Sequence, residues 1–356
     1  MKKHNYSAGP CVLPQEVFQQ AAAAVLEFEN TGLSILEISH RSKEFIAVME
    51  EARALSLELL GLTGKGYQAL FLQGGASLEF LMVPYNLMKV GGKAAYLDTG
   101  AWSGKALKEA KGVGETVVVA SSKDKNYNYI PKNYTIPADV DYLHITSNNT
   151  IFGTQVKDFP KTDVSLVSDM SSDIFSRQLD FSQFDLIYAG AQKNMGPAGT
   201  TLVVVKEDIL GKSGRNIPAM LDYQIHIANE SMYNTPAVYA VYVSLLNLRW
   251  LKNLGGIAAI EKINEHKAQL LYNEIDRNPL FTGTCEVEDR SPMNVCFLLK
   301  DDAHKETFDK LWKAANISGI NGHRSVGGYR ASMYNALAVE SVQALVDCMK
   351  ELENKI

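Results

Sequence analysis

Two charged residues follow apolar runs at positions where a parallel sheet would expose them. Asp169 comes just after the run at residues 164–167, and Lys193 follows the run at 184–188 through the small-residue turn 189–192. In an open α/β sheet, ligands bind beyond the carboxyl ends of the strands. Pyridoxal phosphate requires a lysine that forms a Schiff base and an acid that keeps the pyridine nitrogen protonated. The pair therefore predicts a pyridoxal-phosphate enzyme.

Each member of this pair also has an ordinary structural interpretation. Lys193 alone could be a surface lysine, and Asp169 could open an Asx-turn over residues 170–173. A Schiff-base lysine must be partly desolvated so that its amine is neutral often enough to attack a carbonyl. The glycine-rich segment 196–199 after Lys193 can supply an enclosed turn. Because the acid and the lysine come one strand apart, the functional interpretation is favoured.

Three further segments lie at predicted ends of strands. Residues 74–77, Gly-Gly-Ala-Ser, follow an apolar run and open a helix, where free amides and the Ser77 hydroxyl can bind a phosphate. Trp102 begins another helix and can stack on a flat ring or pack in the core. Thr150 belongs to the polar run 147–150, whose hydrogen-bond donors could bind a ring hydroxyl or could form an ordinary polar turn. Each signal is weak alone, and the P-loop pattern is absent.

Five basic residues stand beside glycines and serines instead of in a charge run. They are His40, Arg41, His323, Arg324 and Arg330. Guanidinium groups suit carboxylates and phosphates, so these residues could bind a doubly anionic substrate. Basic residues are usually solvated at the protein surface, but the placement of these five beside glycines and serines favours anion binding.

The composition is that of a globular protein with a sizeable core, and the length of the chain predicts one large and one small domain. The chain has 356 residues, of which 46% are hydrophobic, and a formal charge of −5. This charge argues against a nucleic-acid partner. No apolar run approaches the roughly 18–20 residues of a membrane span, and no signal peptide is recognisable. We expect a cytoplasmic protein with no membrane partner.

The four cysteines are widely separated and form no Cys-x-x-Cys pair. A disulfide framework and a metal site are therefore not expected. Cys296 lies in an apolar run and Cys348 in an amphipathic segment, so both are predicted to be buried thiols. A reducing cytoplasm fits this pattern.

Strands and helices alternate from residue 67 to residue 146, which predicts crossover connections and a mostly parallel sheet of the α/β class. Residues 216–233 are expected to be irregular. Gly255-Gly256 is the predicted domain break. The predicted division is an N-terminal arm (1–15), a large cofactor-binding domain (16–256) and a small C-terminal α+β domain (257–356).

The chain resembles the phosphoserine aminotransferases, a group within the class V, fold-type I aminotransferases. The resemblance covers essentially the whole chain and is specific in combination, although no single piece is. The matching pieces are residues 5–14, 37–42, 73–77, 99–102, 149–153, 168–172, 188–194, 234–236 and 322–332.

This resemblance implies a large domain with a mostly parallel seven-stranded sheet and pyridoxal 5'-phosphate as cofactor. It implies amino transfer from L-glutamate to 3-phosphohydroxypyruvate by a ping-pong cycle, in serine biosynthesis. It also admits a second substrate, 4-phosphohydroxy-L-threonine, in pyridoxine biosynthesis. Lys193 would form the Schiff base and Asp169 would pair with the pyridine nitrogen. Trp102 would stack on the ring, with Thr150 and Gln192 near its hydroxyl.

The remaining implied roles concern anions and a second subunit. Ala76 and Ser77 match positions that bind the cofactor phosphate. Asn234 and Thr235 match a segment that reaches the phosphate from a partner subunit, which implies a homodimer with shared active sites. Arg330 matches the anchor of the substrate α-carboxylate.

The other four basic residues would surround the distal phosphate or carboxylate of the substrate: His40, Arg41, His323 and Arg324. The chain departs from some relatives at two places. Ser77 stands where some carry arginine, and Asn149 stands where some carry glutamate in an Asn-Glu-Thr sequence. The first departure puts part of the distal anion site in doubt.

Two other classes of function remain to be weighed. A cysteine desulfurase of the same fold would need a mobile, exposed cysteine in the second domain, and none of Cys285, Cys296 and Cys348 has that character. A non-catalytic binding protein would be expected to have lost Lys193 or the substrate arginines. An aminotransferase acting on another small amino acid stays open, because the number of arginines does not define substrate length.

Overall fold

The computed structural model describes residues 3–356. Its largest element is a seven-stranded sheet with the strand order β2-β8-β7-β6-β5-β3-β4. Strand β8 is antiparallel to both of its neighbours, and the other pairs are parallel. The predicted mostly parallel sheet is confirmed. The strands are β2 (Tyr67–Leu72), β3 (Lys93–Asp98), β4 (Glu115–Ser121), β5 (Tyr142–Thr146), β6 (Ser165–Asp169), β7 (Leu186–Gly190) and β8 (Thr201–Lys206).

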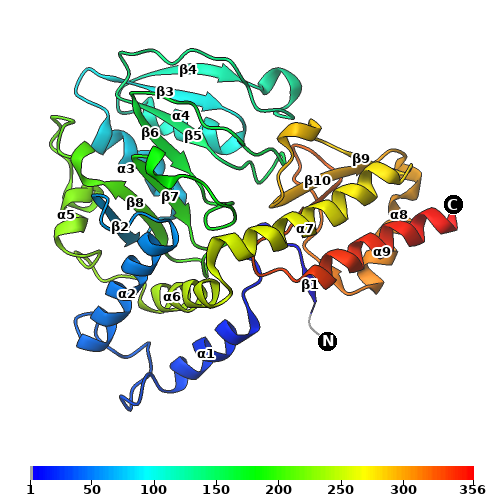
Figure 1. Ribbon diagram of the computed structural model, residues 1–356, viewed down its shortest axis with the longest axis horizontal. Helices are drawn as coiled ribbons and strands as arrows, with labels where there is room; N and C mark the ends of the chain where they lie inside the picture. The colour runs from blue at the N-terminus through cyan, green and yellow to red at the C-terminus, as the bar shows by residue number, and fades with distance from the viewer. Residues whose placement is uncertain (1–2) are drawn as a thin grey trace.

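Helices cover this sheet and close its hydrophobic core (Figure 1). Ser42 caps the second of them, because its hydroxyl accepts a hydrogen bond from the Phe45 amide at 3.4 Å. Strands β2, β3, β5, β6, β7 and β8 are almost wholly buried, which explains their near-continuous apolar sequences. The helices are α1 (Gln15–Leu26), α2 (Lys43–Leu59), α3 (Gly75–Leu87), α4 (Ala101–Ala110), α5 (Tyr223–Ala228) and α6 (Val238–Asn253).

Helix α5 corrects one expectation from the sequence. Residues 216–233 were expected to be irregular, but the segment contains α5, which Asp222 caps by accepting a hydrogen bond from the Gln224 amide at 2.8 Å. The helix is only six residues long. A stretch this short shows little 3.6-residue periodicity, and periodicity is the main signal for a helix in a sequence.

The C-terminal part of the chain forms a second, smaller core. Figure 1 shows it beside the large sheet, with α7 running from one part to the other. Its three-stranded sheet has the order β12-β10-β9 and is antiparallel. Helix α6 ends at Asn253 and α7 begins at Gly256, so the helix break falls at the predicted glycine pair. The elements are α7 (Gly256–Arg277), β9 (Phe281–Gly283), β10 (Asn294–Leu299), α8 (Lys305–Ala314), β11 (Ile317–Ser318), β12 (Tyr329–Ser332) and α9 (Val339–Lys355).

The N-terminal arm packs on this smaller core. Strand β1 (His4–Asn5) pairs in parallel with β11. The fully buried Tyr6 follows, and its hydroxyl donates a hydrogen bond to the Ser341 carbonyl at 2.5 Å. The two ends of the sequence are therefore joined in the fold, which sequence patterns did not predict.

No helix within residues 3–356 combines the length and apolarity that crossing a bilayer requires. All four cysteines are free thiols. Cys296 and Cys348 are buried, as predicted.

Candidate active site

The predicted lysine and acid face one small cavity at the carboxyl ends of β6 and β7. Its volume is about 130 Å³. Seven of the predicted site residues line it: Ala76, Ser77, Trp102, Thr150, Asp169, Gln192 and Lys193. Five other residues complete the lining: Gly75, Thr146, Asn148, Ser171 and Ser172. The sheet therefore brings together residues that lie more than one hundred positions apart in the sequence.

Lys193 lies in the turn between β7 and β8 and is partly buried. Its Nζ donates a hydrogen bond to Thr150 Oγ1 at 2.8 Å. Burial of the amine lowers the pKa of Lys193 to about 8, although the nearby Asp169 carboxyl acts in the opposite direction. A lysine with a lowered pKa is neutral for a substantial fraction of the time near neutral pH, so it can act as a nucleophile.

Asp169 is the last residue of β6 and is only 4% exposed. Its Oδ1 accepts a hydrogen bond from the Ser171 amide at 2.9 Å, so the Asx-turn considered from the sequence is present as well. Burial raises the pKa of the Asp169 carboxyl. Within residues 3–356, no cation forms an ion pair with it. A buried acid without a cationic partner is costly unless a positive group from outside the chain completes it.

Helix α3 presents its N-terminus to the same cavity. It begins at Gly75, so Ala76 and Ser77 lie in its first turn. The amides of a first turn have no acceptor within the helix, and they favour anions. Gly74 precedes the helix with φ 94°. A Cβ there would meet Leu78 Cβ at 2.5 Å, so the turn requires glycine.

A buried polar network lies behind Asp169, and sequence reasoning did not identify it. Ser147 Oγ donates to the Asp169 carbonyl at 3.0 Å and also to the Asp173 carboxylate. Arg177 forms an ion pair with Asp173 at 3.1 Å, and Gln155 donates to the same carboxylate at 3.2 Å. These contacts fix the ends of β5 and β6. The only sequence signal was the polar character of residues 171–173, which an ordinary turn would also show.

The N-terminal arm passes directly over Lys193, a second feature that the sequence did not reveal. The Cys11 thiol donates to the Lys193 carbonyl at 2.6 Å, and the Cys11 amide donates to the Gln192 carbonyl at 3.2 Å. Gly9 has φ 132°, and a Cβ there would lie 3.2 Å from Lys193 Cγ. The arm thus restricts the conformations open to the lysine.

The basic residues from the C-terminal part approach the cavity from one side. Arg330 Nη1 donates to the Thr150 carbonyl at 3.3 Å. Partial burial lowers the pKa of His323, and the positive charges of Arg330, Arg324 and Lys105 lower it further. The three cations Arg330, Arg324 and Lys105 therefore lie near His323. Lys105 was not singled out in the sequence.

The other two predicted basic residues lie elsewhere within this chain. His40 and Arg41 occupy the loop before α2. Neither shares a side-chain hydrogen bond or an ion pair with the residues that line the cavity, all of which belong to the described part of the chain.

Asn234 and Thr235 lie on an exposed loop and are not among the cavity-lining residues of their own chain. Gln73 holds the loop. Asn234 Nδ2 donates to Gln73 Oε1 at 3.4 Å, and Gln73 Nε2 donates to the Thr235 carbonyl at 3.1 Å.

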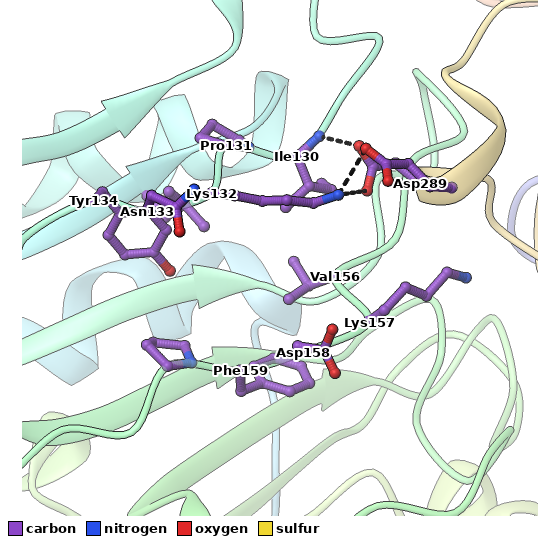
Figure 2. A pocket seen from close by; sticks show the side chains of 13 residues that line it. Ile130, Pro131, Lys132, Asn133, Tyr134, Val156, Lys157, Asp158, Phe159 and Asp289 are labelled. Atoms are coloured by element: carbon purple, nitrogen blue, oxygen red, sulfur yellow. Dashed lines mark hydrogen bonds and ion pairs between the residues drawn. The ribbon is translucent and has the colours of Figure 1, made fainter.

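Larger cavities exist away from this site. One of them has a volume of about 470 Å³. Figure 2 shows that Lys132 extends toward Asp289 in this cavity. Lys132 is paired with Glu288 at 2.7 Å, and Asp289 also accepts a hydrogen bond from the Ile130 amide at 2.9 Å. The charges of Lys132, Glu288 and Asp289 are therefore already matched. Size alone would therefore select the wrong cavity.

Comparison with known proteins agrees with this geometry. Residues 4–345 match the family model described as aminotransferase class-V. A curated relative from Flavobacterium psychrophilum, a phosphoserine aminotransferase, is 74% identical over 356 residues and is covered completely, as is this chain.

Two solved structures extend the comparison. The phosphoserine aminotransferase from Bacillus circulans subsp. alkalophilus superposes with a TM-score of 0.96 at 44% identity, with 99% of each chain covered. The pyridoxal-phosphate-bound phosphoserine aminotransferase from Trichomonas vaginalis gives 0.93 at 35% identity, covering 98% of this chain and all of that one. The chain therefore belongs to the class V aminotransferase family, among the phosphoserine aminotransferases.

Proposed function

We propose that this protein transfers the amino group of L-glutamate to 3-phosphohydroxypyruvate, giving O-phospho-L-serine and 2-oxoglutarate in serine biosynthesis, with pyridoxal 5'-phosphate as cofactor. The observation that best supports this proposal is the position of a lysine with a lowered pKa and of a buried, unpaired acid. Both face one cavity at the carboxyl ends of adjacent strands. The phosphoserine aminotransferase that is 74% identical over the whole chain supports this substrate class.

The donor set of the cavity fits the cofactor. Asp169 lacks a cationic partner in the described chain, and a protonated pyridine nitrogen would supply one. The first-turn amides at Ala76 and Ser77 would bind the phosphate, and Trp102 would lie against the ring. Thr150 and Gln192 would contact the ring hydroxyl. The cofactor, once bound, supplies an electron sink for the negative charge that develops at the substrate Cα.

Lys193 would accept the proton from the substrate Cα and later return a proton in the transfer. Its pKa of about 8 places it in the range where an amine can both accept and return a proton near neutral pH. Thr150 Oγ1, which accepts a hydrogen bond from the Lys193 amine, would orient that amine. Asp169 would stay ionised when a positive ring nitrogen is bound, because the opposite charge would offset the effect of burial on the pKa of its carboxyl.

The basic residues would bind the two anionic ends of the substrate. Arg330 already reaches the Thr150 carbonyl, so its guanidinium can bind an α-carboxylate at the edge of the cavity. His323 and Arg324 lie in the loop before β12 and would face the distal anion. His40 and Arg41 would join them from the partner subunit.

We infer a homodimer with shared active sites. Leu26, Leu33 and Leu36 are exposed apolar side chains next to the His40-Arg41 loop, and Tyr233 is exposed beside Asn234. Apolar side chains gathered near functional loops suit burial in an interface. Docking there would let Asn234 and Thr235 complete the phosphate site of the other subunit. Light scattering that gives the mass of a single chain at micromolar concentration would contradict this assembly.

A half-reaction tests the substrate assignment. The purified protein, loaded with pyridoxal phosphate, is first treated with L-glutamate and freed of 2-oxoglutarate. It is then mixed separately with 3-phosphohydroxypyruvate, pyruvate and glyoxylate, and return of the original spectrum is followed. We expect the phosphorylated acceptor to react with the highest kcat/KM. Preference for either unphosphorylated acceptor would contradict the proposed substrate.

A further inference from the structure

Lys105 is a cation beside the cavity that belongs to none of the motifs and has none of the roles described above. It lies on α4, one helical turn after Trp102, and its Nζ is 4.3 Å from the centroid of the Trp102 ring. The Nζ of Lys193 is 5.8 Å from the same centroid. The two amines are thus separated by no more than about 10 Å, the sum of these two distances. Lys105 therefore stands near the reacting centre.

The surroundings of Lys105 contain positive charge without a matching acid. Lys105, Arg324 and Arg330 are each close enough to His323 to act on its charge. In the part of the chain that the structure describes, none of these four residues forms an ion pair. Like charges that converge without a counter-charge disfavour one another, and a bound anion relieves this repulsion. The cluster is therefore suited to a ligand that carries more than one negative charge.

The α3 side of the cavity supplies no cationic side chain of its own. Helix α3, from Gly75 to Leu87, contains neither lysine nor arginine, and Ser77 offers only a hydroxyl. The neighbouring helix α4 carries three lysines close together: Lys105, Lys108 and, just past its end, Lys111. Only Lys105 of these three lies over the Trp102 ring, so Lys105 is the α4 cation that contacts a cavity-lining residue.

We propose that Lys105 binds the distal anionic group of the substrate and raises the preference for a phosphate over a carboxylate. This inference rests on the proposed function. A phosphate monoester carries about −1.5 to −2 charges at pH 7, whereas a carboxylate carries one. The ammonium group acts as a point charge on a flexible stem, so its attraction for the phosphate exceeds its attraction for the carboxylate.

Paired variants on the same helix test this role in the holoenzyme. Lys105→Met keeps the apolar stem against Trp102 but removes the charge. Lys108 is also exposed but does not contact Trp102, so Lys108→Met makes the same change in net charge away from that ring. Binding of O-phospho-L-serine and of L-glutamate is measured by spectral titration of the bound cofactor. Inorganic phosphate serves as a competing probe.

We expect Lys105→Met to weaken O-phospho-L-serine binding by roughly tenfold or more, the loss of one charge-assisted hydrogen bond. Glutamate binding should fall by only about twofold to threefold, since its distal group has one charge. Inorganic phosphate should compete less well. Lys105→Arg should restore most of the difference, and Lys108→Met should match the wild type.

Two results would overturn the role of Lys105. In one, Lys105→Met binds both amino acids as the Lys108→Met control does. In the other, it weakens both by the same factor, which would indicate a structural effect through Trp102. A wild-type holoenzyme that responds to glutamate but not to O-phospho-L-serine would instead contradict the proposed function. The wild type alone would show that the proposed function is wrong, whereas only the variants can show that the role of Lys105 is wrong. The two failures are therefore distinguishable.

Discussion

Lys193 and Asp169 in the small cavity, and Lys132 and Asp289 in the larger one, differ in how their charges are matched. Lys132 is paired with Glu288, and Asp289 is held by the Ile130 amide. At the smaller cavity, neither Lys193 nor Asp169 has an ion-pair partner within the described chain. Charges left unmatched in a buried place are costly to keep, so they are more informative about function than the size of a cavity.

The strongest contrast should come from removing each lysine. Lys193→Ala should lower kcat by more than about 10⁴-fold, because it removes both the covalent attachment and the base. The visible absorption of the bound cofactor should be lost as well. Lys132→Ala, the matched variant in the larger cavity, should retain wild-type turnover. Equal losses from both variants would remove the functional distinction between the two cavities.

Neutralising the buried acid should have the next largest effect. Asp169→Asn keeps the shape of the side chain but cannot stabilise a positive ring nitrogen, so kcat should fall on the order of 10²- to 10³-fold. The Asx-turn with Ser171 can persist, since an asparagine oxygen also accepts a hydrogen bond. Steady-state kinetics measure the loss, and circular dichroism checks the fold. Turnover within twofold of the wild type would contradict the assigned role.

The pKa of Lys193 predicts a pH dependence for cofactor uptake by the cofactor-free protein. A protonated amine cannot attack an aldehyde, so the rate should rise by roughly tenfold per pH unit below pH 8 and level off above it. A free lysine derivative, whose pKa is about 10.4, should show a rate that keeps rising through pH 9. Stopped-flow absorbance measures both. A rate for the protein that parallels the free amine would show that Lys193 is not desolvated.

The smallest effect is expected from removing Asp289 in the larger cavity, which should change the stability of the fold and not the activity. Asp289→Ala leaves the buried Ile130 amide without an acceptor, which should lower the free energy of unfolding by about 1–3 kcal/mol. Asp158→Ala, at an exposed position in the same cavity, should change it by less than about 0.5 kcal/mol. Urea unfolding measures both, and kcat should stay unchanged. A loss of turnover in Asp289→Ala would mean that this cavity also serves the reaction.

Much of the candidate site could be predicted because its members follow local rules. Asp169 ends β6 and Lys193 lies in the turn after the neighbouring strand β7, and parallel strands place their carboxyl ends on one edge. The glycine pair before Ser77 marks a strand-to-helix turn that opens toward that edge. Strand and helix periodicity was enough to place these residues in one region.

Contacts that depend on packing between distant segments could not be predicted. Cys11 meets Lys193 across 182 sequence positions, and nothing in residues 9–11 alone points to that encounter. The Ser147–Asp173 contact and the approach of Lys105 to His323 have the same character. Such pairs arise from tertiary structure, and a single sequence carries no periodic signal for them. The proposed domain division likewise stays a prediction.

The pairing of β1 with β11 makes the amino end of the polypeptide a poor place for purification handles. An extension there would be attached next to His4, which pairs with Ile317, and a few residues from the segment that lies over Lys193. Ile356, by contrast, is 61% exposed at the end of α9 and contributes to neither cavity. Affinity tags and surface immobilisation therefore belong at the carboxyl terminus, where they leave the chemistry undisturbed.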